Sequence, residues 1–508
     1  MGFGSGGPAS MSYVLSLLIA LPLFAAPLVY LATRADRRLG IYISLGLAVA
    51  VTAIATYIFW QVYSAPPAPG TYLFQEKYSW ISFSNFGLDY FLGTDGLSSP
   101  LLFVSALLTV LVIIGSRRLI DHHEAEYYSL IFLFEGAIMG VFTSLNLILF
   151  YIFWEVVLIP MFFFIGVWGG PRRKYAALKF IIFTFAGSTI MLLGFLYVYL
   201  GMTGTPGVAP SFNIPDLAGR IPLALQYVPL VASFIGFAVK LPLVPFHTWL
   251  PDAHVEAPSP ISVLLAGVLL KMGGYGFLRI SIGLFPIAST QYAWIFLALG
   301  LFSMFYGAAA AVLQRDLKKM IAFTSINHMG FVLFGAYATL ISGNLLGIQG
   351  AIFQMFAHAL AVGSLFMLTG YIQHQAGTRE IPMLKGLGTM MPRTAAILVL
   401  ASAAAMGLPP FSSFLAEFMV IAAGISASAL TAVSILVPVI TAGYFLWMIK
   451  RTVLSPAEGG HEVHDMAWSD VAAFAAYLVP LVILIVASYL ILTPALPVAQ
   501  FLRGLGLG

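Results

Sequence analysis

The chain has 508 residues, of which 60% are hydrophobic and only 8% are charged, and its mean hydropathy is +0.98. Soluble domains carry about 25% charged residues, so this composition excludes a soluble protein and indicates a polytopic membrane protein. The absence of cysteine excludes a disulfide scaffold and thiolate-held metal, and the net charge of +4 comes with no basic stripe or phosphate-binding loop that would indicate a nucleic-acid partner.

The apolar segments along the chain predict an all-α fold. Residues 1–10 are rich in Gly and Ser, which is typical of a tail, and Met11 is an alternative start. Arginines follow the first apolar run rather than precede it, which indicates an uncleaved span and not a signal peptide. With about 20 apolar residues needed per span, we expect about fourteen transmembrane helices. Their expected limits are 12–33, 39–63, 97–116, 127–142, 144–168, 175–201, 226–250, 259–283, 291–313, 319–341, 347–373, 394–425, 428–450 and 470–492.

Two features outside the spans carry further information. Residues 64–93 are rich in Pro, Gly, Ser and aromatics, with alternation around Ser79–Ser84, and predict an extramembrane loop or hairpin. Of the Lys and Arg residues in the loops, sixteen (Lys318 among them) fall on one side and four on the other, namely Lys77, Arg220, Arg279 and Arg503. The positive-inside rule therefore predicts that the sixteen are cytoplasmic and that both termini lie outside.

Ionisable residues inside apolar spans mark proton or ion pathways, because charge is costly in hydrocarbon. Lys240, Lys271 and Glu155 are predicted to lie near the middle of the bilayer, and Glu417 follows a Gly-Leu-Pro-Pro break. Glu135 lies in the fourth span.

The seventh and twelfth spans are both expected to be broken, by Pro242 and Pro245 in one and by Pro409 and Pro410 in the other. They are five helices apart, and an odd-numbered repeat inserts with opposite orientation. We therefore expect two inverted five-helix repeats, each with a broken helix. The expected divisions are 1–126 (three helices and an external loop), 127–283 and 291–453 (the repeats, each a proton half-channel), and 454–508 (a C-terminal helix).

Each candidate residue has a functional and a structural interpretation. Burial disfavours a charged lysine and a nearby carboxylate favours it, so Glu155 and Lys240 can form a switchable pair, or a static ion pair that locks two helices together. Lys271 is the candidate central relay and Glu417 the terminal donor or acceptor. Glu135 is an accessory acid or a structural hydrogen-bond partner. His247, His328 and His358 suit a relay because imidazole accepts and donates protons, or each is a satisfied buried polar group. No pattern indicates a metal site.

Long motifs carry a family resemblance. Residues 239–260 read Val-Lys-Leu-Pro-Leu-Val-Pro-Phe-His-Thr-Trp-Leu-Pro-Asp-Ala-His-Val-Glu-Ala-Pro-Ser-Pro, and residues 270–279 read Leu-Lys-Met-Gly-Gly-Tyr-Gly-Phe-Leu-Arg. Together with Phe-Trp-Glu at 153–155 and Gly-Leu-Pro-Pro-Phe at 407–411, they resemble the antiporter-like subunits of respiratory complex I, over about residues 90–450. Related subunits occur in multi-subunit sodium/proton antiporters and membrane-bound hydrogenases. Glu417, where sister subunits usually carry lysine, makes the chain most similar to the chain M type.

The resemblance implies a proton-translocating membrane-arm subunit of a complex-I-type NADH:quinone oxidoreductase. It implies an acid–lysine pair at Glu155 and Lys240, a central lysine at Lys271 and an exit-side acid at Glu417. It also implies no cofactor in this chain, with flavin, iron–sulfur clusters and quinone in partner subunits, and two sister antiporter-like chains as neighbours. We expect a bacterial or archaeal cytoplasmic membrane ahead of an organellar inner membrane. Two alternatives stay open: a subunit of a sodium/proton antiporter or membrane-bound hydrogenase, and a structural scaffold that transmits conformational change.

Overall fold

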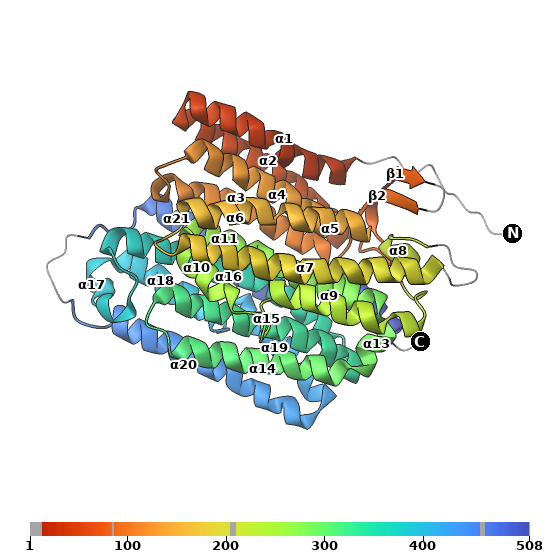
Figure 1. Ribbon diagram of the computed structural model, residues 1–508. Coiled ribbons are helices and arrows are strands. Elements are labelled where there is room, and N and C mark those ends of the chain that lie inside the picture. The colour runs from red at the N-terminus through yellow and green to blue at the C-terminus, as the bar shows by residue number, and fades with distance from the viewer. Residues whose placement is uncertain (1–12, 84–85, 204–209, 458–462, 507–508) are drawn as a thin grey trace.

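The computed structural model describes residues 13–83, 86–203, 210–457 and 463–506, which form a bundle of helices with one β hairpin at its end (Figure 1). Residues 1–10 lie outside this described part. Within it, thirteen helical segments are long and apolar enough to cross a membrane, and Pro392–Ala405 and Ser412–Ala427 are shorter apolar helices on the two sides of a break. The chain is therefore a multi-pass membrane protein, and the expected all-α membrane fold is confirmed.

The helices follow the predicted spans closely. In the first part of the chain they are α1 (Val14–Ala35), α2 (Arg37–Ser64), α3 (Ser98–Leu119), α4 (Glu124–Thr143), α5 (Leu147–Val156), α6 (Leu158–Trp168), α7 (Arg173–Thr203), α8 (Ile214–Leu217), the 3-10 helix η1 (Leu223–Leu225), α9 (Tyr227–Lys240), α10 (Trp249–Glu256), α11 (Ser259–Leu264), the π-helix η2 (Leu265–Leu269), α12 (Leu270–Gly276), the π-helix η3 (Phe277–Ile282) and α13 (Pro286–Gln291). In the second part they are α14 (Ala293–Val312), α15 (Leu317–Ser342), α16 (Leu346–Ala376), η4 (Ile381–Met383), α17 (Leu387–Met390), α18 (Pro392–Ala405), α19 (Ser412–Ala427), η5 (Ala429–Ile435), α20 (Leu436–Thr452), α21 (Trp468–Val486) and α22 (Tyr489–Leu505).

Polar residues fix where several of these helices begin. The Asp36 carboxylate accepts a hydrogen bond from the backbone N–H of Leu39 at 2.8 Å, and Asn146 and Asp316 cap α5 and α15 in the same way. Such caps satisfy backbone donors that the first turn of a helix leaves free.

The predicted breaks in the seventh and twelfth spans are confirmed. Helix α9 ends at Lys240 and α10 begins at Trp249, with Pro242 and Pro245 between them. Helix α18 ends at Ala405 and α19 begins at Ser412, with Pro409 and Pro410 between them. Proline cannot donate the backbone hydrogen bond that would continue either helix. The division into inverted repeats at 127–283 and 291–453 stays a prediction.

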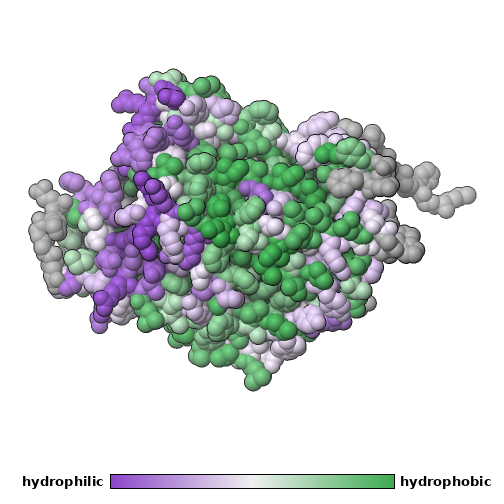
Figure 2. Space-filling view, viewed as in Figure 1, coloured by the Kyte–Doolittle hydropathy of each residue, from purple (hydrophilic) through white to green (hydrophobic). Residues whose placement is uncertain are grey.

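The hairpin consists of the antiparallel strands β1 (Leu73–Phe83) and β2 (Phe86–Thr94), as the sequence predicted for this region. It is tied to the start of α1, because the carboxylate of Glu76 accepts a hydrogen bond from the backbone N–H of Leu15 at 2.9 Å. Hydrophilic residues gather at the opposite end of the bundle, with a broad apolar band between the two ends (Figure 2).

Two sequence expectations differ from the structure. The last predicted span, 470–492, is interrupted: α21 ends at Val486, and a further helix, α22, runs past the predicted limit to Leu505. The apolar run continues across the interruption at Ala487 and Ser488, so hydropathy does not reveal it. Lys318 and Arg279, which we assigned to loops, are buried within α15 and η3, with side chains 2% and 6% exposed.

The centre of the bundle is made by α15, α16 and the segment from α11 to η3. The core of α16 and that of Ser259–Ile282 are buried along their whole apolar length, whereas α7, α14 and α21 show much of theirs at the surface. A side chain on the central helices is therefore enclosed by protein on all sides, and any ionisable group there needs a protein or water partner.

Candidate functional site

Lys271 lies on α12, the short α-helical segment between the π-helices η2 and η3. Its ammonium donates a hydrogen bond of 2.5 Å to the carbonyl oxygen of Ala266, and its Nζ lies 2.6 Å from Nδ1 of His358 on α16. Wide π turns are often found at functional sites, and here one precedes the lysine directly. The side chain is only 1% exposed, so these two contacts replace water around the ammonium group.

The contact between Lys271 and His358 continues through two more ionisable groups. The ring of His328 on α15 lies edge-on to the ring of His358, with centroids 5.4 Å apart. The Nε2 of His328 lies 3.6 Å from Oε1 of Glu417 on α19. We call these four residues, Lys271, His358, His328 and Glu417, the central row. All four are at most 4% exposed, and the sequence had singled out each of them.

Glu417 is positioned by the break between α18 and α19. Gly407 within this break has φ of +66°, and a Cβ at this position would lie 2.7 Å from Oε2 of Glu417. The carboxylate therefore rests against a backbone position that only glycine fills without strain. Glu417 also lines a largely apolar groove of about 670 Å³ with residues of α19, η5 and α20, so this end of the central row approaches the lateral surface.

Lys240 is completely buried at the C-terminal end of α9. Its Nζ lies over the rings of Trp154 on α5 and Phe180 on α7, 5.2 and 5.7 Å from their centroids, and has no hydrogen-bond partner among the described residues. Glu155, the residue after Trp154, attracts this charge electrostatically, but no ion pair joins the two in the described structure. Glu155 itself is half-buried on α5.

Close backbone approach brings α12 against α9. A Cβ at Gly273 would lie 2.6 Å from the backbone nitrogen of Leu241, the residue after Lys240. Glycine is required there because any side chain would push the two helices apart. The helices that carry Lys240 and Lys271 are thus held in contact, although Lys240 turns toward α5 and α7.

Two accessory candidates lie outside the central row. Glu135 on α4 is 1% exposed, and neither of its carboxylate oxygens has a hydrogen-bond partner in the described part of the chain. His247 lies in the break after α9, where its ring stacks edge-on against Tyr306 at 4.7 Å. Neither contacts Lys271 or Glu417 through a hydrogen bond among these residues.

Sequence reasoning missed two buried groups next to the central row. Lys318 donates a hydrogen bond to the carbonyl oxygen of Ala257, and His254 on α10 lies flat against Phe366 with centroids 4.3 Å apart. His254 interacts electrostatically with both Lys318 and Lys271. Lys318 falls two residues after Asp316 at the start of a span, which resembles a loop position, and only the packing of α15 against α10 reveals its burial.

A second buried charge cluster lies toward the hairpin end of the molecule. Arg279 donates a hydrogen bond of 2.6 Å to the carboxylate of Asp95 and further ones to the hydroxyl groups of Tyr72 and Tyr275. Both tyrosine rings also face the guanidinium group at 5.0 and 5.3 Å. This fully partnered pair ties η3 to the segment before α3 and to the strands, so its evident role is to hold these elements together.

The central row has the chemistry of a proton conductor. Lysine and carboxylate hold or release one proton, and imidazole accepts on one nitrogen while it donates from the other. The distance of 3.6 Å between His328 and Glu417 exceeds a direct hydrogen bond and is a separation that one water molecule bridges.

Comparison with known proteins places the whole chain among membrane subunits of one kind. Residues 144–442 match the family described as NADH:quinone oxidoreductase/Mrp antiporter, and residues 41–152 match the family described as the amino terminus of NADH-ubiquinone oxidoreductase chain 4. NADH-quinone oxidoreductase subunit M of Rickettsia prowazekii is 38% identical over 482 residues, covering 93% of this chain and 94% of that protein. NAD(P)H-quinone oxidoreductase chain 4 of Trichormus variabilis is 39% identical over 408 residues, covering 80% and 73%.

Solved structures share the fold. A chain of respiratory complex I from Thermus thermophilus superimposes with a TM-score of 0.84 at 28% identity, covering 97% of this chain and 100% of that one. A chain of an Mrp complex from Dietzia has a TM-score of 0.82 at 21% identity, covering 97% and 98%, which shows similarity of fold alone.

Proposed function

Because the chain belongs to the family of membrane subunits described as NADH:quinone oxidoreductase/Mrp antiporter, we propose that it is a proton-translocating membrane-arm subunit of a complex-I-type NADH:quinone oxidoreductase. The observation that carries this proposal is the central row, in which Lys271, His358, His328 and Glu417 follow one another through a fully buried interior. Ionisable groups in such a place are costly unless they conduct ions or protons.

Lys271 acts as the central proton carrier of this relay. Its proton passes to Nδ1 of His358 at 2.6 Å, while the other nitrogen of the same ring releases a proton toward His328. His328 delivers to Glu417 through a bridging water, and Glu417 is the exit-side acid. Buried polar atoms without protein partners, among them Nε2 of His358 and both ring nitrogens of His328, support hydration of this path, because such atoms normally bind ordered water.

Lys240 and Glu155 form the electrostatic switch that loads the relay. When the two charges approach, the ammonium group is held protonated, and when they separate, Lys240 releases its proton toward Lys271. The aromatic bed of Trp154 and Phe180 supports this role, since it stabilises a cation without fixing it in an ion pair. Glu135, His247, His254 and Lys318 are accessory groups along the hydrated path.

Two acids away from the centre of the bundle support the presence of neighbouring subunits. Glu155 is half-buried on α5, Glu417 lines the groove beside α20, and in Figure 1 α20 runs along the lower edge of the bundle, well apart from α5. Sister antiporter-like subunits at these two sides would sense a change of charge at either acid. Electron transfer in other subunits would drive proton movement in this chain through such changes of charge. The chain itself carries no flavin, iron–sulfur cluster or quinone.

The proposed location is a bacterial cytoplasmic membrane with both termini on the outer side. The bias of basic residues supports this orientation. The hydrophilic end of the bundle, which lies opposite the hairpin (Figure 2), would then face the cytoplasm. A subunit of a sodium/proton antiporter would share the fold, but the similarity of sequence to subunit M over nearly the whole chain favours the complex-I assignment.

The test is to purify the complex that contains this chain, identify its subunits by mass spectrometry and reconstitute it in liposomes. We expect NADH-module and quinone-module subunits to co-purify, and NADH oxidation to acidify the compartment opposite the NADH site. Co-purification with antiporter or hydrogenase subunits instead, or quinone reduction without any proton movement, would contradict the proposal.

A further inference from the structure

An open groove of about 680 Å³ runs between α2, α3 and the start of α21 at the hydrophilic end of the bundle. Its volume falls within the range of ordinary small-molecule sites. The groove, which we call the arginine groove, is lined by Arg37, Arg38, Ile41, Tyr42, Leu45, Ile114, Arg117, Arg118, Ser469 and Asp470. None of these residues belongs to the central row or takes part in the proposed proton path.

The charge of the groove is positive and not fully balanced. Arg37 pairs with Glu124 at 2.5 Å, and Arg118 pairs with Asp470. Arg38 and Arg117 have no carboxylate partner among the described residues and are exposed at the groove. Two guanidinium groups are therefore free to bind an anion, and a guanidinium group matches the geometry of a phosphate oxygen pair.

Polarity changes along the groove in one direction. Arg38 lies at the start of α2, and Leu45 lies seven residues further along, about 10 Å deeper at 1.5 Å per residue. On α3, Ile114 lies about one turn below Arg118 in the same sense. The rim is thus cationic and the lower wall is apolar, with Tyr42 between them. A free phosphate or a soluble nucleotide would leave the lower wall unused, whereas a phospholipid matches both parts.

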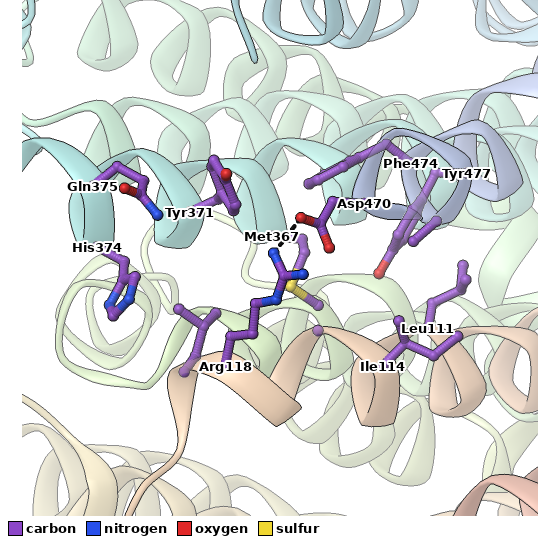
Figure 3. A pocket seen from close by; sticks show the side chains of 13 residues that line it. Leu111, Ile114, Arg118, Met367, Tyr371, His374, Gln375, Asp470, Phe474 and Tyr477 are labelled. Carbon is purple, nitrogen blue, oxygen red and sulfur yellow. Dashed lines mark hydrogen bonds and ion pairs between the residues drawn. The ribbon is translucent and has the colours of Figure 1, made fainter. Parts of the chain in front are cut away.

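The back of the groove is fixed in place. The ion pair between Arg118 and Asp470 separates the groove from a smaller cavity of about 90 Å³, and Figure 3 shows both side chains meeting beside Met367. Because Asp470 already pairs with Arg118, Arg38 and Arg117 remain as the unpaired guanidinium groups of the groove.

We propose that the arginine groove binds an anionic phospholipid, with its phosphate between Arg38 and Arg117 and its acyl chains along Ile41, Leu45 and Ile114. Basic pockets between transmembrane helices are known to suit such headgroups. The bound lipid fills the space between α2 and α21, which both line the groove.

The proposal is tested on the full-length chain, purified in detergent with the subunits that accompany it. Native mass spectrometry follows titration with dioleoylphosphatidylglycerol, with dioleoylphosphatidylcholine and with inorganic phosphate. The double variant Arg38→Gln/Arg117→Gln is compared with Lys450→Gln/Arg451→Gln, which removes the same charge from the last turn of α20. At about 1 kcal/mol per basic residue, and 1.4 kcal/mol per tenfold, the groove variant should bind the anionic lipid about 30-fold more weakly.

We expect the control variant to bind the anionic lipid within about twofold of the unmodified chain, and the neutral lipid and phosphate to bind weakly to all three proteins. Equal affinity for the anionic lipid in both variants would overturn the proposal. The proposal would also be overturned if the neutral lipid bound as tightly as the anionic lipid, or if the unmodified chain bound phosphate but no lipid. It would be overturned as well if another protein subunit covered the groove. Because no outcome depends on proton pumping, the result is independent of the function proposed above.

Discussion

The Nζ of Lys271 lies 2.6 Å from Nδ1 of His358, inside a bundle where both side chains are at most 1% exposed. This contact joins the π-interrupted segment around α12 to α16, the longest buried helix in the centre of the molecule. Lys271 also donates a hydrogen bond to the backbone carbonyl of Ala266. Among the described residues, His358 is therefore the only one whose side chain hydrogen-bonds to Lys271.

Replacement of His358 should therefore interrupt the relay beyond Lys271. We expect His358→Leu and His358→Gln to lower coupled turnover about tenfold or more, because neither side chain accepts and donates a proton as imidazole does. The measurement is NADH-driven proton uptake in liposomes. His374→Leu, on the exposed end of the same helix α16, is the control and should leave it unchanged. Normal pumping in both His358 variants with full assembly would exclude this step.

Substitution of Gly407 should displace the Glu417 carboxylate while leaving the glutamate itself in the chain. In Gly407→Ala, the new Cβ would lie 2.7 Å from the Glu417 carboxylate, at a backbone φ of +66° that costs an alanine about 1–2 kcal/mol. We expect a lower midpoint of thermal unfolding together with reduced pumping. Gly443→Ala on α20 is the matched control, since a Cβ there meets nothing within 4 Å. Equal behaviour of the two variants would show that the break does not position the acid.

Removal of one partner of the buried pair between Asp95 and Arg279 should be costly. Asp95→Ala leaves the Arg279 guanidinium uncompensated in a site where both side chains are 6% exposed, which typically destabilises by about 3–5 kcal/mol. The double variant Asp95→Ala/Arg279→Met should recover part of this loss. Thermal unfolding in detergent measures both, with Asp121→Ala as a surface control because Asp121 is 93% exposed. A loss as small as that of the control would mean that the pair adds nothing.

The attachment of the loop before α21 to the start of α18, through Asp465, should depend on pH. Burial alone would raise the pKa of Asp465, but hydrogen bonds from the backbone of Arg393, Met466 and Thr394 lower it below its usual value. A lowered pKa in the folded state contributes stability above the unfolded value of about 3.9, and this stability is lost as pH falls through the folded pKa.

We therefore expect strong protection from hydrogen exchange at the first turn of α18 at neutral pH, measured relative to the intrinsic rate at each pH, and a loss of this protection only below about pH 4. Asp465→Asn should show weak protection at both pH values, because the neutral amide is a weaker acceptor for these donors. Protection in the unmodified chain that already falls between pH 7 and pH 5 would assign the effect to another group.

The sequence was sufficient to predict most of the long apolar helices, both breaks and all four members of the central row, because charges and prolines in apolar runs are rare enough to stand out. It could not show that Lys271 bonds to His358 rather than to an acid, since residues 87 positions apart meet only through the packing of α12 on α16. Lys318 was missed for a related reason: a lysine near the start of a span resembles a loop residue until α10 is packed over it. The π turns before and after α12 also left no pattern in hydropathy.

The most direct test of the account is the number of protons translocated per NADH oxidised by complexes that carry Lys271→Ala. The account predicts that these complexes assemble with all subunits and translocate fewer protons per NADH, because the central carrier is missing. A complex that assembles fully and retains the unmodified ratio would show that the chain is a scaffold and that its buried groups carry no protons.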